Sequence, residues 1–197
     1  MPESIVRSSK EMVMNSTAVR FIAGCAALFL LGSFANVSAQ VSPLAKAKDR
    51  TLAPALSLLN AQGKQVRLSD YRGKVVLLDF WATDCGGCRI EIPEYVQIQA
   101  AYKNRGLAVV GVSMDVMYEN LKNAKEAWNR VNPFVEQQKI SYPILMGDDQ
   151  TMKSFGFNAL PATYLIDRNG RIAASYVGVL INRDNVEKNI GLLLKKD

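Results

Sequence analysis

The sequence predicts an α/β fold in which a mixed central sheet is sandwiched between layers of helices. Apolar runs at 75–80 and 107–114 lack the polar alternation of half-exposed strands, so they suit central strands that are covered on both faces. Segments with helical periodicity follow each of these runs. Near the C-terminus, Asn169-Gly170 between two apolar runs is a strong hairpin signal, which adds antiparallel strands to the sheet.

Two short strands are expected ahead of the first central strand. They fall within residues 56–68 on either side of a turn at 60–64, where Gly63 supplies a permissive backbone. A second turn, at 69–74, then leads the chain into the strand at 75–80. The folded part of the chain is therefore expected to begin with a β-hairpin.

Two helices are expected in the middle of the chain. The first follows the strand at 75–80, and Pro93 should kink it because proline has no backbone N–H to donate. The second is a helical insertion at 118–139, which Pro133 should break. The apolar stripe of the first helix consists of Tyr95, Ile98 and Tyr102.

The C-terminal part completes the sheet. Residues 142–146 predict a third strand, and the strands at 163–167 and 172–177 flank the turn at 168–171. A closing helix buries Val186, Ile190 and Leu193.

Residues 1–39 predict a signal peptide. Arg20 precedes an apolar run at 21–35, and small side chains stand three and one positions before a cut after Ala39. Met14 is an alternative start that gives a signal of ordinary length. The other interpretation is an uncleaved membrane anchor with the domain facing outside, although the run is shorter than the about 20 residues that span a bilayer.

Residues 40–51 are polar and rich in Ala and Lys, which predicts a flexible lead to a single domain at 52–197. Cys25 lies in the signal, and a lipid anchor there is disfavoured because the apolar run follows the cysteine when it should precede it. Only Cys85 and Cys88 then remain in an exported chain. A loop this small gives little stabilisation, so the pair points to redox chemistry.

Charge and composition exclude several classes of function. The formal net charge of +6 is spread along the chain, which fits a solubilising surface and argues against nucleic-acid binding. The sequence has no histidine, so Ser-His triads and His-based metal sites have no base or ligand. A closed zinc site needs four ligands, and two cysteines do not supply them. No metal or other cofactor is expected.

The motif Cys85-Gly86-Gly87-Cys88 carries the chemistry. It follows a buried strand and opens a helix, which is the arrangement of a thiol–disulfide exchange device. Unpaired N–H groups and the helix dipole should favour a thiolate at Cys85, the expected nucleophile. Cys88 lies one turn further along and should resolve the mixed disulfide.

The residues around this motif resemble a known family. The block at 76–88 is similar to the thioredoxin active-site region, and its flanks at 73–74 and 89–93 resemble the exported thioredoxin-like proteins of the TlpA/ResA type in bacteria. The segment Leu160-Pro161-Ala162 and the strand after it resemble that family's cis-proline segment. The resemblance covers about residues 52–195 and implies a thioredoxin-like sandwich in the periplasm or otherwise outside the cytoplasm.

The resemblance also implies roles for single residues. Pro161 should be cis and lie against the disulfide, with the backbone of Leu160 free to pair with a substrate strand. Asp79 should be a buried acid that takes a proton from Cys88, or else a satisfied polar core group. Glu91 should be a second acid near the site, or else a solvated charge. The implied substrate-contacting residues are Trp81, Leu160, Pro161 and Ala162. Trp81 should be part of the platform beside the disulfide, or else simply a core residue.

Two residues depart from the family pattern. Asp84 stands where the family usually has an uncharged residue, and its negative charge should disfavour the Cys85 thiolate and favour a more reducing couple. Gly87 replaces a frequent proline, which loosens the start of the helix. Together with Gly86, these residues are expected to tune the redox couple.

The favoured function is therefore an exported reductase of protein disulfides. The resemblance implies disulfide-bearing protein substrates and a membrane thiol electron donor, with membrane contact only through an uncleaved N-terminal segment. Three alternatives stand beside it: a disulfide-donating oxidase or isomerase, a peroxidase, and a non-catalytic binding or assembly module. Oxidases of this kind often carry His between the cysteines, and peroxidases need Pro and Thr at set spacings that Thr83 does not meet.

Overall fold

The computed structural model describes residues 40, 41 and 43–195. The predictions for the signal peptide, including the start at Met14 and the cut after Ala39, lie outside the described residues. No helix in the described part of the chain is both long enough and apolar enough to cross a membrane.

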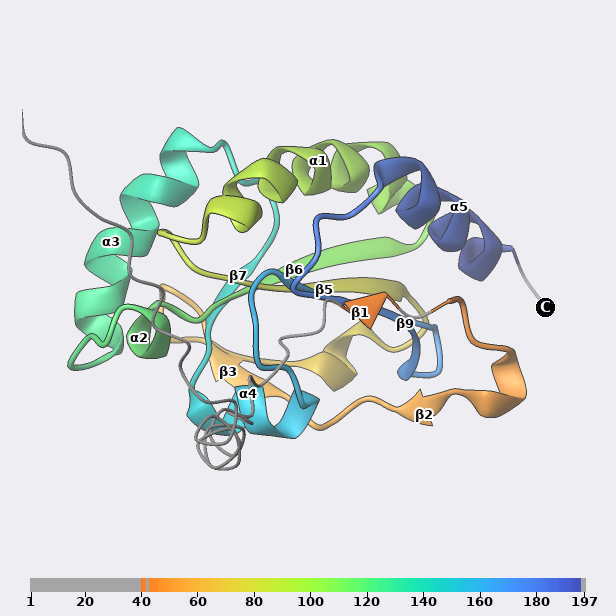
Figure 1. Ribbon diagram of the computed structural model, residues 1–197, viewed down its shortest axis with the longest axis horizontal. Coiled ribbons are helices and arrows are strands. Elements are labelled where there is room, and N and C mark those ends of the chain that lie inside the picture. Colours follow the sequence, from red (N-terminus) through yellow and green to blue (C-terminus); the bar gives the residue numbers. More distant parts are fainter. Residues whose placement is uncertain (1–39, 42, 196–197) are drawn as a thin grey trace, which may run out of the picture. The chain divides into compact units, whose positions relative to one another are not determined.

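A seven-stranded mixed sheet forms the centre of the domain, with the strand order β1-β9-β8-β5-β6-β7 and with β2 also paired to β9 (Figure 1). Strands β5, β6 and β7 are parallel, whereas β8 and β9 run antiparallel to their neighbours. This arrangement confirms the predicted α/β fold. The strands are β1 (Gln40–Val41), β2 (Thr51–Leu52), β5 (Val75–Trp81), β6 (Leu107–Ser113), β7 (Ile144–Met146), β8 (Ala162–Ile166) and β9 (Arg171–Val177).

Two short strands outside this sheet form the predicted N-terminal hairpin. They are β3 (Ser57–Leu59) and β4 (Gln65–Arg67), which pair antiparallel. Residues 40–51 were expected as a flexible lead. They include β1, which pairs with β9, and they end on the first residue of β2, which also pairs with β9.

Helices cover both faces of the sheet, and β5 divides its side chains between them. Val75 and Leu77 pack in the core under α1 (Gly86–Tyr102), α3 (Ala124–Gln137) and α5 (Arg183–Leu194). Val76 and Leu78 pack in a second core, which the hairpin and α4 (Asp149–Phe155) cover from the other side (Figure 1). Because alternate strand residues face opposite sides, Asp79 and Trp81 point to the face that carries α1.

The helical insertion consists of two helices, α2 (Asp115–Tyr118) and α3, where one run at 118–139 was expected. The chain turns at Asn120, which has a positive φ of 51°, and the side chain of Asn123 then caps α3 by accepting the Glu126 N–H. The expectation that Pro133 breaks the helix is wrong, since α3 continues to Gln137. Tertiary packing outweighs the local preference there, because the next residue, Phe134, is buried against the core.

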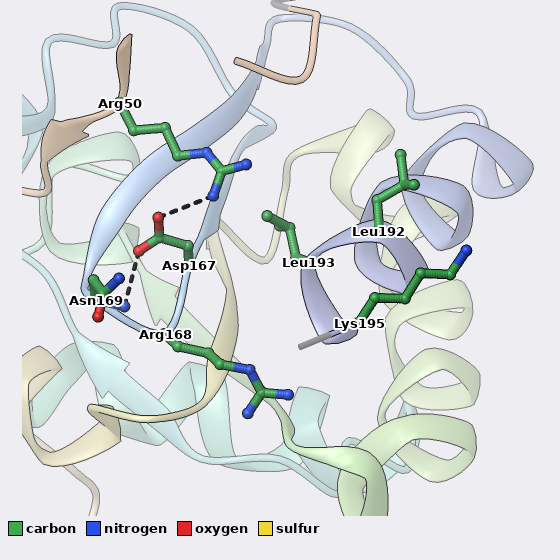
Figure 2. A pocket seen from close by; sticks show the side chains of 7 residues that line it. All are labelled: Arg50, Asp167, Arg168, Asn169, Leu192, Leu193 and Lys195. Atoms are coloured by element: carbon green, nitrogen blue, oxygen red, sulfur yellow. Dashed lines mark hydrogen bonds and ion pairs between the residues drawn. The ribbon is translucent and has the colours of Figure 1, made fainter. Parts of the chain in front are cut away.

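A pocket of about 250 Å³ lies at the end of the sheet opposite to the cysteines (Figure 2). Asp167 follows the end of β8, which pairs with the start of β5, whereas Cys85 comes after the end of β5. The pocket is lined by Arg50, Asp167, Arg168, Asn169, Leu192, Leu193 and Lys195.

The Asp167 carboxylate organises this end of the sheet. One oxygen accepts the backbone N–H groups of Asn169 and Arg171, each at 2.9 Å, and the other accepts a guanidinium N–H of Arg50 at 3.1 Å (Figure 2). One buried carboxylate thus binds three donors, so its role is to close the β8–β9 hairpin against the chain that precedes β2.

Asp167→Ala is therefore expected to lower the free energy of unfolding by about 2–4 kcal/mol, because two backbone donors lose their acceptor and the largely buried Arg50 guanidinium loses its ion pair. Urea denaturation of the purified protein measures this. Asp149→Ala is the matched control, since Asp149 makes only an exposed ion pair with Lys153 and should cost less than about 1 kcal/mol. Equal losses for both variants would contradict this role of Asp167.

Candidate active site

The two cysteines of the motif form a disulfide at the start of α1, with their sulfur atoms 2.03 Å apart. Cys85 is the residue that caps the helix, and its Sγ accepts the backbone N–H of Cys88 at 3.2 Å. The exposed fractions are 5% for Cys85 and 1% for Cys88. Cys85 is thus the more accessible of the two residues, and in the reduced protein the same N–H and the helix N-terminus would stabilise its thiolate.

The cis-proline segment lies directly against the motif. The Leu160–Pro161 peptide bond is cis, and a Cβ placed on Gly87 would lie 3.0 Å from Cδ of Pro161 and 3.4 Å from Leu180. Glycine at position 87 therefore allows the proline and the loop before α5 to approach the disulfide closely. At Gly86, by contrast, a Cβ would meet open space.

The four expected substrate-contacting residues do not all reach the surface. Leu160 is partly exposed, whereas Trp81 and Ala162 are fully buried. The Trp81 ring stacks on Phe134 of α3, with ring centroids 5.2 Å apart, so its side chain belongs to the core. The surface beside the motif instead carries two exposed apolar side chains that were not singled out from the sequence, Ile90 and Leu180.

Asp79 is a buried acid on the strand beneath α1. The Thr163 hydroxyl donates to its Oδ1 at 3.4 Å, and its Oδ2 has no hydrogen-bond partner among the described residues. Burial raises the pKa of Asp79 well above its ordinary value, and the negative charge of Glu91 raises it further. The group therefore holds its proton more tightly than an exposed aspartate does.

Glu91 is buried on α1 one turn after Cys88. Its Oε1 accepts the backbone N–H of Ile181 at 2.7 Å, and its Oε2 accepts the Tyr95 hydroxyl at 3.3 Å. Burial raises the pKa of Glu91 from 4.5 to about 7, although both hydrogen bonds oppose this shift. A carboxyl with such a pKa can exchange protons near neutral pH.

Hydroxyl groups connect the two acids. The oxygens of Tyr95 and Thr163 lie 2.8 Å apart, so a row of close polar contacts runs from Glu91 through Tyr95 and Thr163 to Asp79. Because each hydroxyl has one hydrogen, all three contacts are hydrogen bonds at the same time only when one of the two carboxyls is protonated and donates. Sequence reasoning missed both linking residues, because Tyr95 fits the apolar stripe of α1 and Thr163 fits a strand. The spacing of four residues between Glu91 and Tyr95 was the one available signal.

Asp84 is not the isolated negative charge that the sequence suggested. Its carboxylate forms ion pairs with Arg89 at 3.5 Å and with Arg130 of α3. Two guanidinium groups therefore oppose the charge that was expected to act on Cys85. Arg130 lies far along the chain from the motif, so no local pattern could reveal it.

The described residues contain no group of three or more His, Cys, Asp or Glu side chains placed to hold a metal ion. The groups that the site does bring together are the cysteine pair, two buried carboxyls and the hydroxyl groups between them.

Comparisons with known proteins agree with this geometry. Residues 50–175 match the model of the AhpC/TSA family. The chain is 32% identical to the thiol-disulfide oxidoreductase ResA of Geobacillus thermodenitrificans over 133 residues, which cover 67% of this chain and 71% of that protein. It is also 32% identical over 136 residues to the thioredoxin-like protein YneN of Bacillus subtilis, covering 69% of this chain and 75% of that one.

A solved structure from Chlorobium tepidum, described as a thiol:disulfide interchange protein DsbE, superposes with a TM-score of 0.64. The two sequences are 33% identical, and the match covers 77% of this chain and 99% of the other. A disulfide at a helix N-terminus, a facing cis-proline and these relatives lead to one conclusion. The chain belongs to the AhpC/TSA family and is a thioredoxin-like thiol–disulfide oxidoreductase related to the ResA and DsbE proteins.

Proposed function

We propose that this protein works outside the cytoplasm as a reductase of disulfides in partner proteins. The observation that carries the direction is the pair of buried carboxyls, Asp79 and Glu91, on the face of the sheet that α1 covers. Strong disulfide donors owe their oxidising power to a stabilised thiolate. When they are ionised, buried carboxylates on this face oppose a further negative charge on the dithiol, which makes the reduced form a better electron donor.

The reaction proceeds in two exchange steps. The Cys85 thiolate attacks one sulfur of the substrate disulfide, and the other substrate sulfur leaves as a thiolate that takes up a proton. Cys88 then attacks Sγ of Cys85, which releases the second substrate sulfur and closes the Cys85–Cys88 disulfide. The dithiol loses two electrons and the substrate disulfide gains them.

The second step needs a base, because Cys88 is buried and must lose its proton to attack. The chain of groups from Glu91 to Asp79 supplies two carboxyls for this purpose, one of which lies one turn from Cys88 on the same helix. As Cys88 becomes a nucleophile, the ionised one of these two carboxyls takes up its proton.

Asp79→Asn is expected to slow the resolving step about tenfold, with Glu91 retaining part of the function. The measurement is the decay of the mixed disulfide after rapid mixing of reduced protein with an oxidised peptide, quenched with acid. The initial attack by Cys85 should keep its rate. A change confined to the first step would contradict the assignment of Asp79 as a base for Cys88.

The partners proposed from this chemistry are exported proteins that carry disulfides and a membrane thiol donor that reduces the Cys85–Cys88 pair again. The domain exposes Leu180 and Ile90 beside the motif, and apolar side chains of a substrate polypeptide can lie against them.

A two-direction assay tests the proposed function. Reduced protein is mixed with disulfide-bonded insulin, and oxidised protein is mixed with a reduced, unfolded protein that needs disulfides. A reductase should transfer electrons to insulin efficiently and should be a poor donor of disulfides. Faster oxidation of the unfolded protein would show that the chain works in the opposite direction.

A further inference from the structure

The segment just before the nucleophile is held by ion pairs from the helical insertion. Asp84 immediately precedes Cys85, and its carboxylate contacts Arg130, a residue of α3. Arg89, on the first turns of α1, approaches the same carboxylate at 3.5 Å. The charge next to Cys85 is therefore set partly by a helix that lies outside the motif.

Arg130 contacts this segment at two points. Its Nε donates to Oγ1 of Thr83 at 2.8 Å, while its outer nitrogen binds Asp84. The Thr83 hydroxyl donates to the fully buried Asp115 at 2.5 Å, and the Thr83 backbone N–H donates to the same carboxylate at 3.2 Å. Residues 83–84 are thus fixed between a buried carboxylate and a guanidinium.

A second residue on the same side of α3 supports the other end of the segment. Phe134, one turn after Arg130, stacks on Trp81 at 5.2 Å, and the guanidinium of Arg89 lies 5.5 Å from its ring centroid. Arg89 also donates from Nε to the carbonyl of Thr83 at 2.7 Å. Helix α3 therefore contacts the chain from the end of β5 to the residue before Cys85.

The charges in this cluster are nearly balanced. Two guanidinium groups, Arg89 and Arg130, face the carboxyls of Asp84, Asp115 and Glu119, the last of which lies 3.5 Å from Arg130. Without Arg130, a single guanidinium would oppose three carboxyls. Asp84, the carboxylate closest in sequence to the nucleophile, would keep only the ion pair with Arg89 at 3.5 Å, with two further carboxyls nearby that lack a cation.

We propose that Arg130 is a positioning residue for thiol–disulfide exchange: it fixes and neutralises Asp84, so that the Cys85 thiolate forms more readily. The inference deepens the proposed function and rests on its nucleophile, Cys85, but not on the direction of electron transfer. In this protein, Asp84 and Arg130 act as a pair, and the helical insertion becomes part of the active site.

Alkylation of Cys85 by iodoacetamide tests the proposal without any substrate protein. All variants are made in a Cys88→Ala background, so that only Cys85 reacts in the described domain, and the rate is followed against pH. Arg130→Gln is expected to lower the rate at pH 6 about three- to fivefold, since a smaller thiolate fraction is partly offset by higher nucleophilicity. The plateau rate at high pH should not fall. Distorted or unfolded protein would change that plateau.

Asp84→Asn tests the pair from its other side. The alkylation rate of Asp84→Asn at pH 6 should rise. When Arg130→Gln is added to Asp84→Asn, it should lower this rate by less than half as much as it does in the parent protein. Arg183→Gln is the matched control, because Arg183 also bridges two carboxylates, Glu94 and Glu187, at a similar exposed fraction (37% against 41% for Arg130). Its pH profile should match that of the parent.

Two results would overturn the proposal. One is an unchanged pH profile of alkylation in Arg130→Gln. The other is an equal fall in the rate at pH 6 when Arg130→Gln is added to the parent and to Asp84→Asn. Because alkylation needs neither substrate nor donor, these outcomes are distinct from a failure of the two-direction assay. Arg130 is partly exposed, so Arg130→Gln is expected to fold. If Arg130→Gln does not fold, the direction in which Asp84→Asn changes the alkylation rate at pH 6 still decides whether Asp84 acts on Cys85.

Discussion

Replacement of Cys88 by alanine should turn the reaction into a dead end, with Cys85 held in a covalent mixed disulfide with the substrate. Cys88 lies next to Cys85 in the structure, so its attack is intramolecular and has a large effective concentration. Turnover with a disulfide-bonded protein should fall at least about a thousandfold when only an external thiol can resolve the intermediate. Non-reducing electrophoresis and intact-protein mass spectrometry detect the adduct.

Cys85→Ala is the matched control for this experiment. The remaining thiol of the motif, Cys88, is almost completely buried and should form no adduct with a protein substrate over the same time. If the Cys85→Ala variant formed as much adduct as the Cys88→Ala variant, the assignment of nucleophile and resolving residue would be wrong.

Glu91→Gln is expected to stabilise the protein above neutral pH. The pKa of Glu91 is raised from 4.5 to about 7 in the folded state, so the folded protein holds this proton more tightly than the unfolded chain. The contribution of Glu91 to the free energy of unfolding is therefore fully present below pH 4.5 and is lost as the pH rises through about 7. The loss amounts to about 3 kcal/mol. Glutamine has no proton to lose, and its amide oxygen can still accept the Ile181 N–H.

Urea denaturation between pH 4 and pH 8 measures this effect. The two proteins should be similarly stable at pH 4, and Glu91→Gln should be the more stable one at pH 8. Glu94→Gln provides the control on the same helix, because Glu94 is partly exposed and paired with Arg183. Its free energy of unfolding plotted against pH should stay parallel to that of the parent. If the free energy of unfolding of Glu91→Gln also ran parallel to that of the parent across this pH range, burial would not perturb the pKa of Glu91.

The central strands and the redox motif could be predicted from the sequence because their signals are local. The runs at 75–80 and 107–114 are apolar without alternation, and β5 and β6 are buried along their whole length. Helix α4 was not predicted, since its seven residues are too few to establish a period. The continuation of α3 past Pro133 depends on the contact between Phe134 and Trp81, which only the folded chain creates.

The electrostatics of the site could be predicted only in part. Resemblance to the exported thioredoxin-like proteins pointed to Asp79 and Glu91, but the hydroxyl groups between them occupy positions that also suit packing. Arg130 and Asp84 meet only because the insertion folds back on the loop after β5. Ion pairs between residues so far apart leave no pattern in a single sequence.

The reduction potential of the Cys85–Cys88 couple tests the central claim most directly. Equilibration with dithiothreitol or glutathione buffers, followed by quantification of free thiols, gives the value. A reductase with buried carboxyls beside its dithiol should have a potential near about −270 mV, as in thioredoxin, or below it. A value near about −120 mV, as in strong disulfide donors, would contradict the proposed direction and the role given to Asp79 and Glu91 in setting it.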